Sequence, residues 1–334
     1  MRRAVATCIG LAIVIAVAVA IYLRRPLETI VDRRPELRKL VAEQEAESAQ
    51  AVANYTPARK GDIGDIGALQ AETLRGLPGV LDVDVMVNPE KAKNRCIVHL
   101  RDWHFVPRDS FAIDMADAYG RTLSADEIDL LYEQHLLEVE LVQLEQIALL
   151  RCLIKHHGLK AVFAEGFAST EIKGYRERVA ALRAVEKEQI PKLREQLKDI
   201  RRLATNDPKT KEKAKAIEAE IVEMLEQHRR RMLEMGSTGQ LLISGELEDV
   251  LPLEDAKALA QSMPIAPDGK MEPDPAKIEA RHDAQVREVM KRKESATVIV
   301  LGGSHDLSAS IRRNTDGKCE YLRVTTKRYR EVSE

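Results

Sequence analysis

Three short apolar runs, each followed by residues that bind metals or transfer protons, constrain the fold of this chain most. The first run, residues 96–100, is followed by Asp102 and His104. The second, 162–164, is followed by Glu165, and the third, 297–301, by Gly302, Gly303 and His305. Runs of this length, bounded by turn residues and separated by helical sequence, are typical of buried strands. The pattern predicts an α/β fold with a mostly parallel sheet flanked by helices.

The ends of these strands predict a single site. In an open α/β sheet, ligands bind at the edge where the strands end, so we expect His104, Glu165 and His305 to lie close together. Asp102 lies two residues before His104 and leaves the same face if the strand continues. Glycine at 302 and 303 lets the backbone approach a ligand without an intervening Cβ, which makes Gly302 and Gly303 candidate ligand-binding residues.

Two histidines and a carboxylate form a ligand set suited to Zn, Mn or Fe with an open coordination position. His104, Glu165 and His305 are therefore the predicted metal ligands, and Glu165 and Asp102 the predicted catalytic residues. The metal would lower the pKa of a bound water and polarise a carbonyl, and Asp102 or Asp306 would orient a ligand or act as a further one. Without a metal, Glu165 would act as a general base and the histidines would stabilise charge. A purely structural role for a histidine at a strand end remains the alternative.

The first residues predict a membrane anchor. Residues 4–23 carry no charge and are bracketed by Arg2-Arg3 and Arg24-Arg25. About 20 apolar residues suffice for a helix to cross a bilayer, and the run ends in a poor cleavage site. We therefore expect an uncleaved transmembrane helix within residues 1–25 and a single-pass protein of the cell membrane. Arginines on both sides leave the side of the main domain open.

The remaining chain divides into a stalk, a domain and an insertion. Residues 26–60 are mostly polar and predict a stalk with a helix over 35–52, and residues 61–334 predict the α/β domain. Residues 171–235 are rich in charge, with apolar residues at three- and four-residue steps and a break at Asn206-Asp207-Pro208. They predict an inserted antiparallel helical hairpin, similar to a short coiled coil, that could pack on the domain or mediate homo-oligomerisation.

Other elements follow from local signals. Ser124 and Glu127 form a capping box that starts a long helix, and Gly158 ends it. We expect a short strand at 240–244, a helix over 246–263 broken at Pro252, and a helix over 276–293. The six further histidines are expected outside the site. His99 is expected as a structural residue on the opposite strand face, His156 and His157 in the last turn of the long helix, and His135, His228 and His282 on exposed helix faces.

Composition argues against several functions. The formal net charge is −2 and aromatic residues make up 4% of the chain, so neither a positive field nor a base-stacking surface favours nucleic acid. The four cysteines contain no C-x-x-C pair, which removes zinc-knuckle and thioredoxin-type motifs. Ser304, His305 and Asp306 are adjacent, and adjacent residues cannot adopt the geometry of a catalytic triad.

The motifs resemble those of a known superfamily, which joins Tiki-type proteases, TraB-type proteins, ChaN-type haem-binding proteins and erythromycin-esterase-like proteins. Its members share an early histidine after a strand, a glutamate at the end of the next strand, and a late glycine-x-x-histidine. His104, Glu165 and Gly302-Gly303-Ser304-His305 match these positions. The helix with Gln143 and Gln146 resembles the one that joins the first two motifs.

The resemblance spans about residues 95–166 and 296–313, and it departs from the family at Arg101, where members often carry glycine. It implies a membrane-anchored, metal-dependent hydrolase of a peptide or ester. It equally allows a non-catalytic protein that binds haem or another planar ligand. A third possibility is an inactive scaffold that recruits partners through the helical hairpin.

Overall fold

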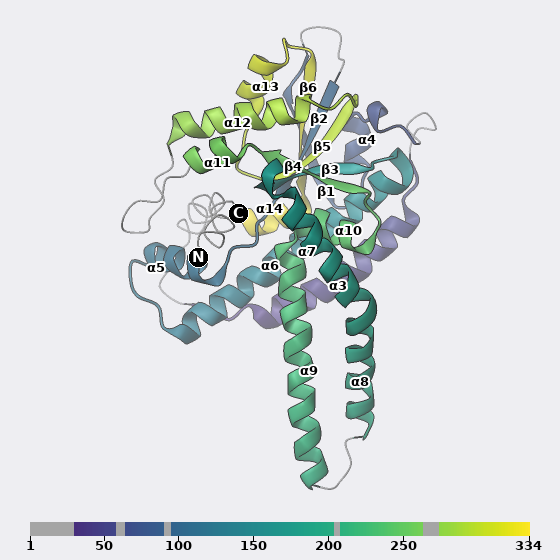
Figure 1. Cartoon of the computed structure of the whole chain (residues 1–334), viewed down its shortest axis with the longest axis vertical. Helices are drawn as coiled ribbons and strands as arrows, with labels where there is room; N and C mark the ends of the chain where they lie inside the picture. Colours follow the sequence, from purple (N-terminus) through teal and green to yellow (C-terminus); the bar gives the residue numbers. More distant parts are fainter. Residues whose placement is uncertain (1–29, 58–63, 90–94, 204–207, 263–273) are drawn as a thin grey trace.

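A computed structural model describes residues 30–57, 64–89, 95–203, 208–262 and 274–334. These residues form a six-stranded sheet in the order β1-β6-β2-β5-β3-β4. The strands are β1 (Val80–Val87), β2 (Arg95–Asp102), β3 (Ala161–Ala168), β4 (Asp249–Glu254), β5 (Ala296–Gly302) and β6 (Cys319–Thr326). β1 pairs with β6 in antiparallel fashion, and the other neighbours are parallel. The predicted α/β fold with a mostly parallel sheet is confirmed (Figure 1).

Helices surround this sheet on both faces. They are α3 (Arg34–Asn54), the short η3 (Ile66–Ala68), α4 (Ala71–Arg75), α5 (Arg108–Tyr119), α6 (Ala125–His157), η4 (Ser169–Glu171), α7 (Ile172–Ala184), the π-helical turn η5 (Val185–Gln189), α8 (Ile190–Leu203), α9 (Pro208–Glu234), α10 (Gly236–Ser244), α11 (Ala256–Ser262), α12 (Pro275–Met290), α13 (Ser308–Asn314) and α14 (Lys327–Ser333).

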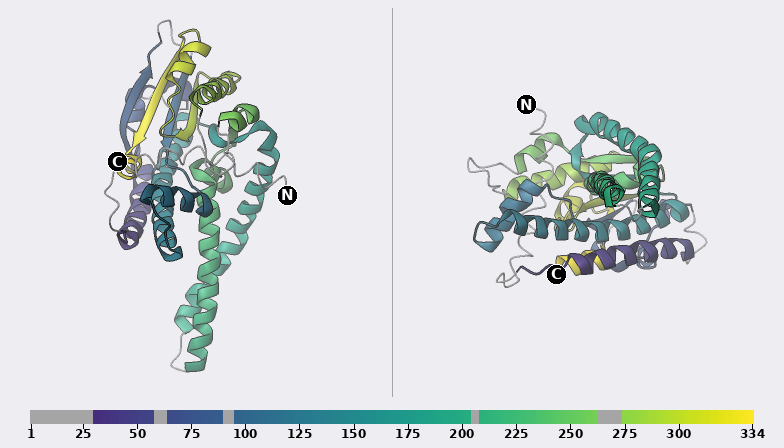
Figure 2. Two further views of the ribbon diagram at one scale, coloured as in Figure 1. Left: turned by 90° about the vertical axis from the view of Figure 1, so that its left-hand side faces the viewer. Right: turned by 90° about the horizontal axis from the view of Figure 1, so that it is seen from below.

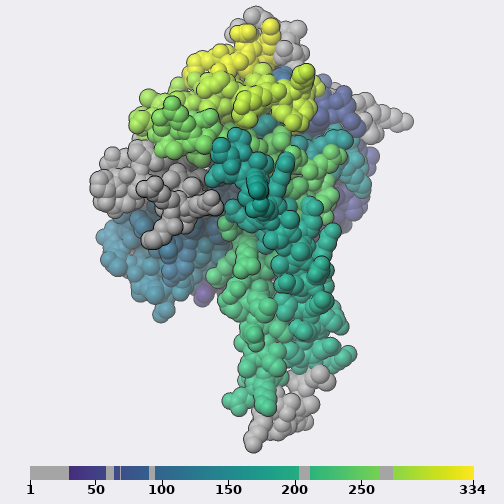
Figure 3. Space-filling view, viewed as in Figure 1, coloured from purple at the N-terminus to yellow at the C-terminus, as the bar shows by residue number. Residues whose placement is uncertain are grey.

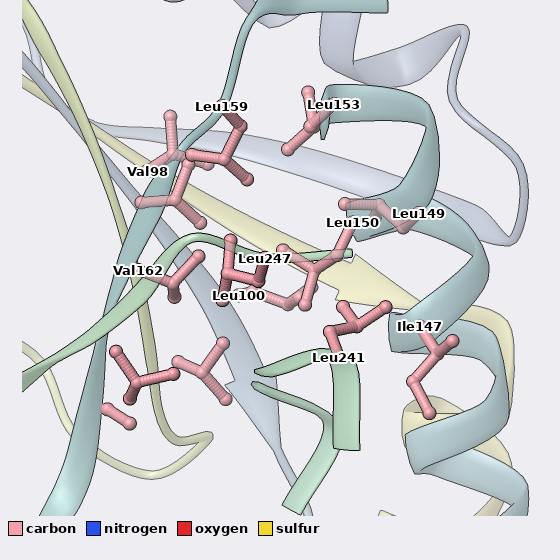
Figure 4. Packing of buried hydrophobic residues seen from close by; sticks show 14 of the residues in the cluster. Val98, Leu100, Ile147, Leu149, Leu150, Leu153, Leu159, Val162, Leu241 and Leu247 are labelled. Carbon is pink, nitrogen blue, oxygen red and sulfur yellow. The ribbon is translucent and has the colours of Figure 1, made fainter. Parts of the chain in front are cut away.

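Strand alternation divides the core between the two faces. Val98 and Leu100 of β2 pack with Leu150 of α6 and with Leu241 of α10 (Figure 4). Residues one position away in the strands, such as Ile97 and Ile299, pack instead with apolar residues of α12 and α13. Because successive side chains of a strand point to opposite faces, a run that is apolar throughout requires helices on both sides.

The long helix α6 begins and ends where the sequence predicts. The Ser124 hydroxyl accepts a hydrogen bond from the Glu127 N–H (3.2 Å), and the Glu127 carboxylate accepts one from the Ser124 N–H (2.8 Å). These two contacts satisfy backbone donors that a helix start leaves free. Gly158 follows the last turn with φ 70°, a conformation that glycine adopts without steric cost.

The segment predicted as a stalk contains the expected helix, but this helix lies along the domain. Leu37 of α3 is buried and packs with Leu137 and Leu141 of α6. Beside them, the Arg33 guanidinium contacts the Glu138 carboxylate at 3.1 Å. The apolar positions of α3 are few, yet they suffice because α6 presents a matching apolar strip. Residues 34–54 are therefore part of the folded body and do not extend away from it.

The predicted transmembrane segment, residues 4–23, lies outside the described residues. Within the described part of the chain, no helix is both long and apolar enough to cross a membrane.

The inserted segment projects from the body as an arm. α7, η5 and α8 run outward and α9 returns antiparallel to α8, as Figures 1 and 2 show. The space-filling view in Figure 3 shows the arm standing clear of the domain. Val179 and Leu182 near its base are buried, whereas Ile217 and Met224 on α9 are exposed. Homo-oligomerisation through this arm stays a prediction.

Two local predictions between the arm and α12 are wrong. Residues 240–244 belong to helix α10, because the apolar cluster Leu241-Leu242-Ile243 packs in the core as the inward side of a helical turn. Residues 249–254, predicted as helical, form the strand β4. Pro252 is tolerated there because β4 is an edge strand, which has only one neighbour in the sheet.

We expect Leu150→Ala to lower the free energy of unfolding by about 2–5 kcal/mol, because it opens a cavity in a packed core. Leu150 is fully buried between α6 and the sheet. Val222→Ala, at an exposed position of α9, is the control and should change the free energy by less than about 0.5 kcal/mol. Urea unfolding followed by circular dichroism measures both. Equal effects of the two variants would contradict the described core.

Candidate functional site

The structure brings the three predicted site residues together: His104 and His305 follow the ends of β2 and β5, and Glu165 lies within β3, one residue after its last pairing with β5, while β3 continues to Ala168. Asp102, the last residue of β2, is in register with Gly302 of β5, and Ala164 of β3 is in register with Val300. This alignment places the residues that follow side by side. His104 Nε2 lies 3.1 Å from Glu165 Oε2, and His305 Nε2 lies 3.3 Å from Glu165 Oε1.

Asp102 holds the other side of the His104 ring. Its Oδ2 lies 3.0 Å from His104 Nδ1. The Gln146 side chain of α6 donates to Asp102 Oδ1 (2.8 Å) and to the Arg101 carbonyl (3.1 Å). Asp102 is therefore fixed by the long helix, and His104 is held between two carboxylates.

The two glycines make room for protein side chains. A Cβ at position 302 would lie 2.5 Å from His104 Nε2, and a Cβ at position 303 would lie 2.0 Å from the Tyr329 hydroxyl. The Gly302 N–H also donates to Glu165 Oε2 (2.8 Å). The two glycines were expected to let a ligand approach the backbone. In this structure the side chains of His104 and Tyr329 occupy that space.

Sequence reasoning missed Arg281 of α12, which completes the site. Its side chain is fully buried, and its Nη2 donates to Glu165 Oε1 at 2.7 Å. The same guanidinium binds the Glu254 carboxylate at the end of β4, with Nε donating to Oε2 at 2.9 Å. One signal was present in the sequence: Arg281 lies four and eight residues before the buried Gln285 and Val289, on the inward side of α12.

Three histidines expected on exposed helix faces are buried or bound. His282 Nε2 lies 2.9 Å from His305 Nδ1, so His282 belongs to the site network. His135 is buried beside Phe111, and His228 contacts Glu186 at 2.5 Å inside the arm. These predictions were wrong because charged neighbours along a helix do not reveal which position faces inward.

His99 has the structural role predicted for it. One ring nitrogen lies 2.6 Å from the Tyr321 hydroxyl and the other 2.9 Å from the Leu301 carbonyl.

Opposite charges set the protonation of the network. Burial lowers the pKa of His104, but the charges of Glu165 and Asp102 outweigh burial and raise it to about 10. Burial raises the pKa of Glu165, and the nearby His305 and His104 reverse this effect and hold that pKa well below its ordinary value. Burial lowers the pKa of His282 to about 3, with His305 adding to the shift. At neutral pH, His104 is a cation, Glu165 an anion and His282 neutral.

A cleft of about 990 Å³ opens onto this network. Asp102, His104 and Glu165 line it, together with residues of α7, the end of α9 and the start of α10. His104 Nε2 is buried and lacks a hydrogen-bond partner, since its contact with Glu165 does not have the alignment of a hydrogen bond.

The residues as arranged do not fit a metal ion. Among the described residues, no group of three or more His, Cys, Asp or Glu side chains is placed to hold one. The two histidines approach different oxygens of Glu165, and the Arg281 guanidinium occupies one of these oxygens.

Binding of haem or another planar ligand, the alternative implied by the resemblance, stays a prediction.

Comparisons of the chain with protein-family models, with curated proteins and with solved structures found no match. Membership of the Tiki, TraB, ChaN and erythromycin-esterase-like superfamily stays a prediction from the sequence motifs.

We expect His104 to make stability depend on pH. Its folded-state pKa is raised from 6.5 to about 10, so its contribution is complete below about pH 6.5 and is lost as pH rises through 10. The difference in unfolding free energy between the wild type and His104→Gln should therefore shrink from near pH 6 to near pH 10. Urea unfolding at a series of pH values measures it. A difference that stays constant would contradict the charged state of His104.

We expect Arg281→Met to lower the free energy of unfolding by about 3–5 kcal/mol, because two buried carboxylates lose their shared cation. Arg176→Met is the control: Arg176 pairs with Asp249 at 3.2 Å but is 60% exposed, and exposed pairs contribute less than about 1 kcal/mol. Urea titration of both variants measures the difference. A loss in Arg281→Met no larger than in the control would show that Arg281 does not anchor the site.

Proposed function

We propose that the cleft is the active site of a hydrolase that cleaves an ester or peptide bond by acid–base catalysis. The observation that carries the proposal is the state of His104. This side chain is cationic, it lines the cleft, and its Nε2 lacks a hydrogen-bond partner. A preorganised cationic donor in a partly buried cleft is suited to stabilising the oxyanion that forms during acyl transfer.

Glu165 supplies the base in this proposal. A water in the cleft attacks the acyl carbon while the Glu165 carboxylate accepts one of its protons. The carbonyl oxygen becomes an oxyanion and accepts a hydrogen bond from His104 Nε2. The tetrahedral intermediate then expels the alcohol or amine, which takes the proton back from Glu165. The products are a carboxylic acid and the alcohol or amine, and the enzyme regains its starting state.

The surrounding residues support both roles by position. Asp102 holds His104 in orientation and charge, and Gln146 holds Asp102. Arg281 and the Gly302 N–H fix the Glu165 carboxylate from the other side. The charges of His305 and His104 lower the pKa of Glu165 and keep it ionised in the neutral range.

We expect Glu165→Gln and His104→Gln each to lower kcat/KM by about 10²–10⁴-fold, the range for removing a general base or an oxyanion donor. Nitrophenyl esters and fluorogenic peptides are suitable substrates. Glu171→Gln is the matched control, because Glu171 also lines the cleft but accepts a hydrogen bond from the Ala168 N–H. Glu165→Gln activity equal to that of this control would contradict the proposal.

The same assay tests the metal dependence predicted from the sequence. In the mechanism above, activity survives dialysis against a chelator, and the purified chain contains no stoichiometric zinc, manganese or iron. Activity that disappears on chelation and returns with one of these metals would overturn the metal-free mechanism and support a metal-dependent hydrolase. The membrane anchor also stays a prediction.

A further inference from the structure

The start of helix α10 forms part of the cleft wall. Gly236, Ser237 and Thr238, the first three residues of α10, line the cleft together with Glu165. The residue before the helix, Met235, provides no side-chain cap. The first N–H groups of a helix have no partner within it, and the helix dipole adds partial positive charge at this end.

A second observation at the same place indicates a missing acceptor. Ser237 is 1% exposed, and its hydroxyl has no hydrogen-bond partner among the described residues. A buried hydroxyl without a partner costs free energy, and such groups are rare in folded proteins. An anion at the start of α10 would accept hydrogen bonds from this hydroxyl and from the backbone N–H groups together.

One cation of the cleft wall has no ion-pair partner among the described residues. Lys173 lines the wall and is exposed, whereas Arg178 contacts Glu234 at 3.3 Å and Arg108 contacts Asp129 at 2.6 Å. A monoanion suits a single unpaired cation better than a phosphate dianion, which would require several.

We propose that the start of α10 is a subsite for a carboxylate of the substrate, such as the terminal carboxylate of a short peptide. That this ligand is a substrate depends on the proposed hydrolase function, whereas its binding does not. A substrate then makes two contacts in the cleft. Its carboxylate binds at Ser237, and its scissile acyl group lies at His104 and Glu165.

Calorimetric titration of the full-length chain in detergent tests the subsite without turnover. The probes are N-acetylglycine, which carries the carboxylate, and N-acetylglycinamide, which lacks the charge. The wild type should bind the acid and show no measurable binding of the amide. Ser237→Ala should weaken binding of the acid by about tenfold or more, the effect of losing a hydrogen bond to a charged group.

Ser244→Ala is the matched control, because Ser244 ends the same helix and its hydroxyl donates to the Leu241 carbonyl outside the cleft. It should bind N-acetylglycine as the wild type does. Equal affinities of Ser237→Ala and Ser244→Ala, or no binding of the acid by the wild type, would overturn the subsite. Tighter binding of inorganic phosphate than of N-acetylglycine would overturn its assignment to a carboxylate.

Glu165→Gln separates this inference from the proposed function. The variant should lose hydrolysis and keep its affinity for N-acetylglycine, because the proposed donors to the carboxylate are the Ser237 hydroxyl and the first N–H groups of α10. If Glu165→Gln loses that affinity, the carboxylate does not bind at α10 and the subsite proposal is wrong. A variant that keeps full hydrolysis would instead refute the active site and leave the anion subsite in place.

Discussion

The buried carboxylate of Glu165 is the interaction on which the rest of the structure depends. It faces Arg281 from α12, the Gly302 N–H from β5, and the rings of His104 and His305. A buried charge is tolerated only when partners replace the water it has lost. These partners come from segments far apart in the sequence, so the charge can be compensated only when the parallel strands have the observed register. The fold and the site therefore specify each other.

Helix α6 connects this charge network to the core and to the arm. Its Leu150 packs on the sheet, and its Gln146 holds Asp102. One turn earlier, Gln143 donates to the Leu233 carbonyl near the end of α9 and accepts from Gln240 of α10. A single helix thus holds both Asp102 and the base of the arm, and both line the cleft. A displacement of the arm would change the cleft through these amide contacts.

The sequence allowed the strands that carry the site to be predicted, because β2, β3 and β5 are apolar runs that end in distinctive residues. It did not allow the role of Arg281 to be predicted, since an arginine in a charged helix gives no sign of a partner on another strand. β4 was missed because Pro252 argues against a strand unless its edge position is known. His282 was placed outside the site for the reason that applies to Arg281, as its contact with His305 depends on tertiary packing alone.

The two borders of the sheet differ in how well they resist pairing with another chain. On the β4 side, Pro252 removes one backbone donor from the border strand. On the β1 side, Leu81 and Val85 are exposed and no proline interrupts the strand. Asp82 and Asp84 place carboxylates on that strand, and Asp84 lies 3.6 Å from Arg323 of β6. The β4 border is thus protected by a missing donor, whereas the β1 border carries charged side chains, a second way in which proteins discourage edge-to-edge pairing.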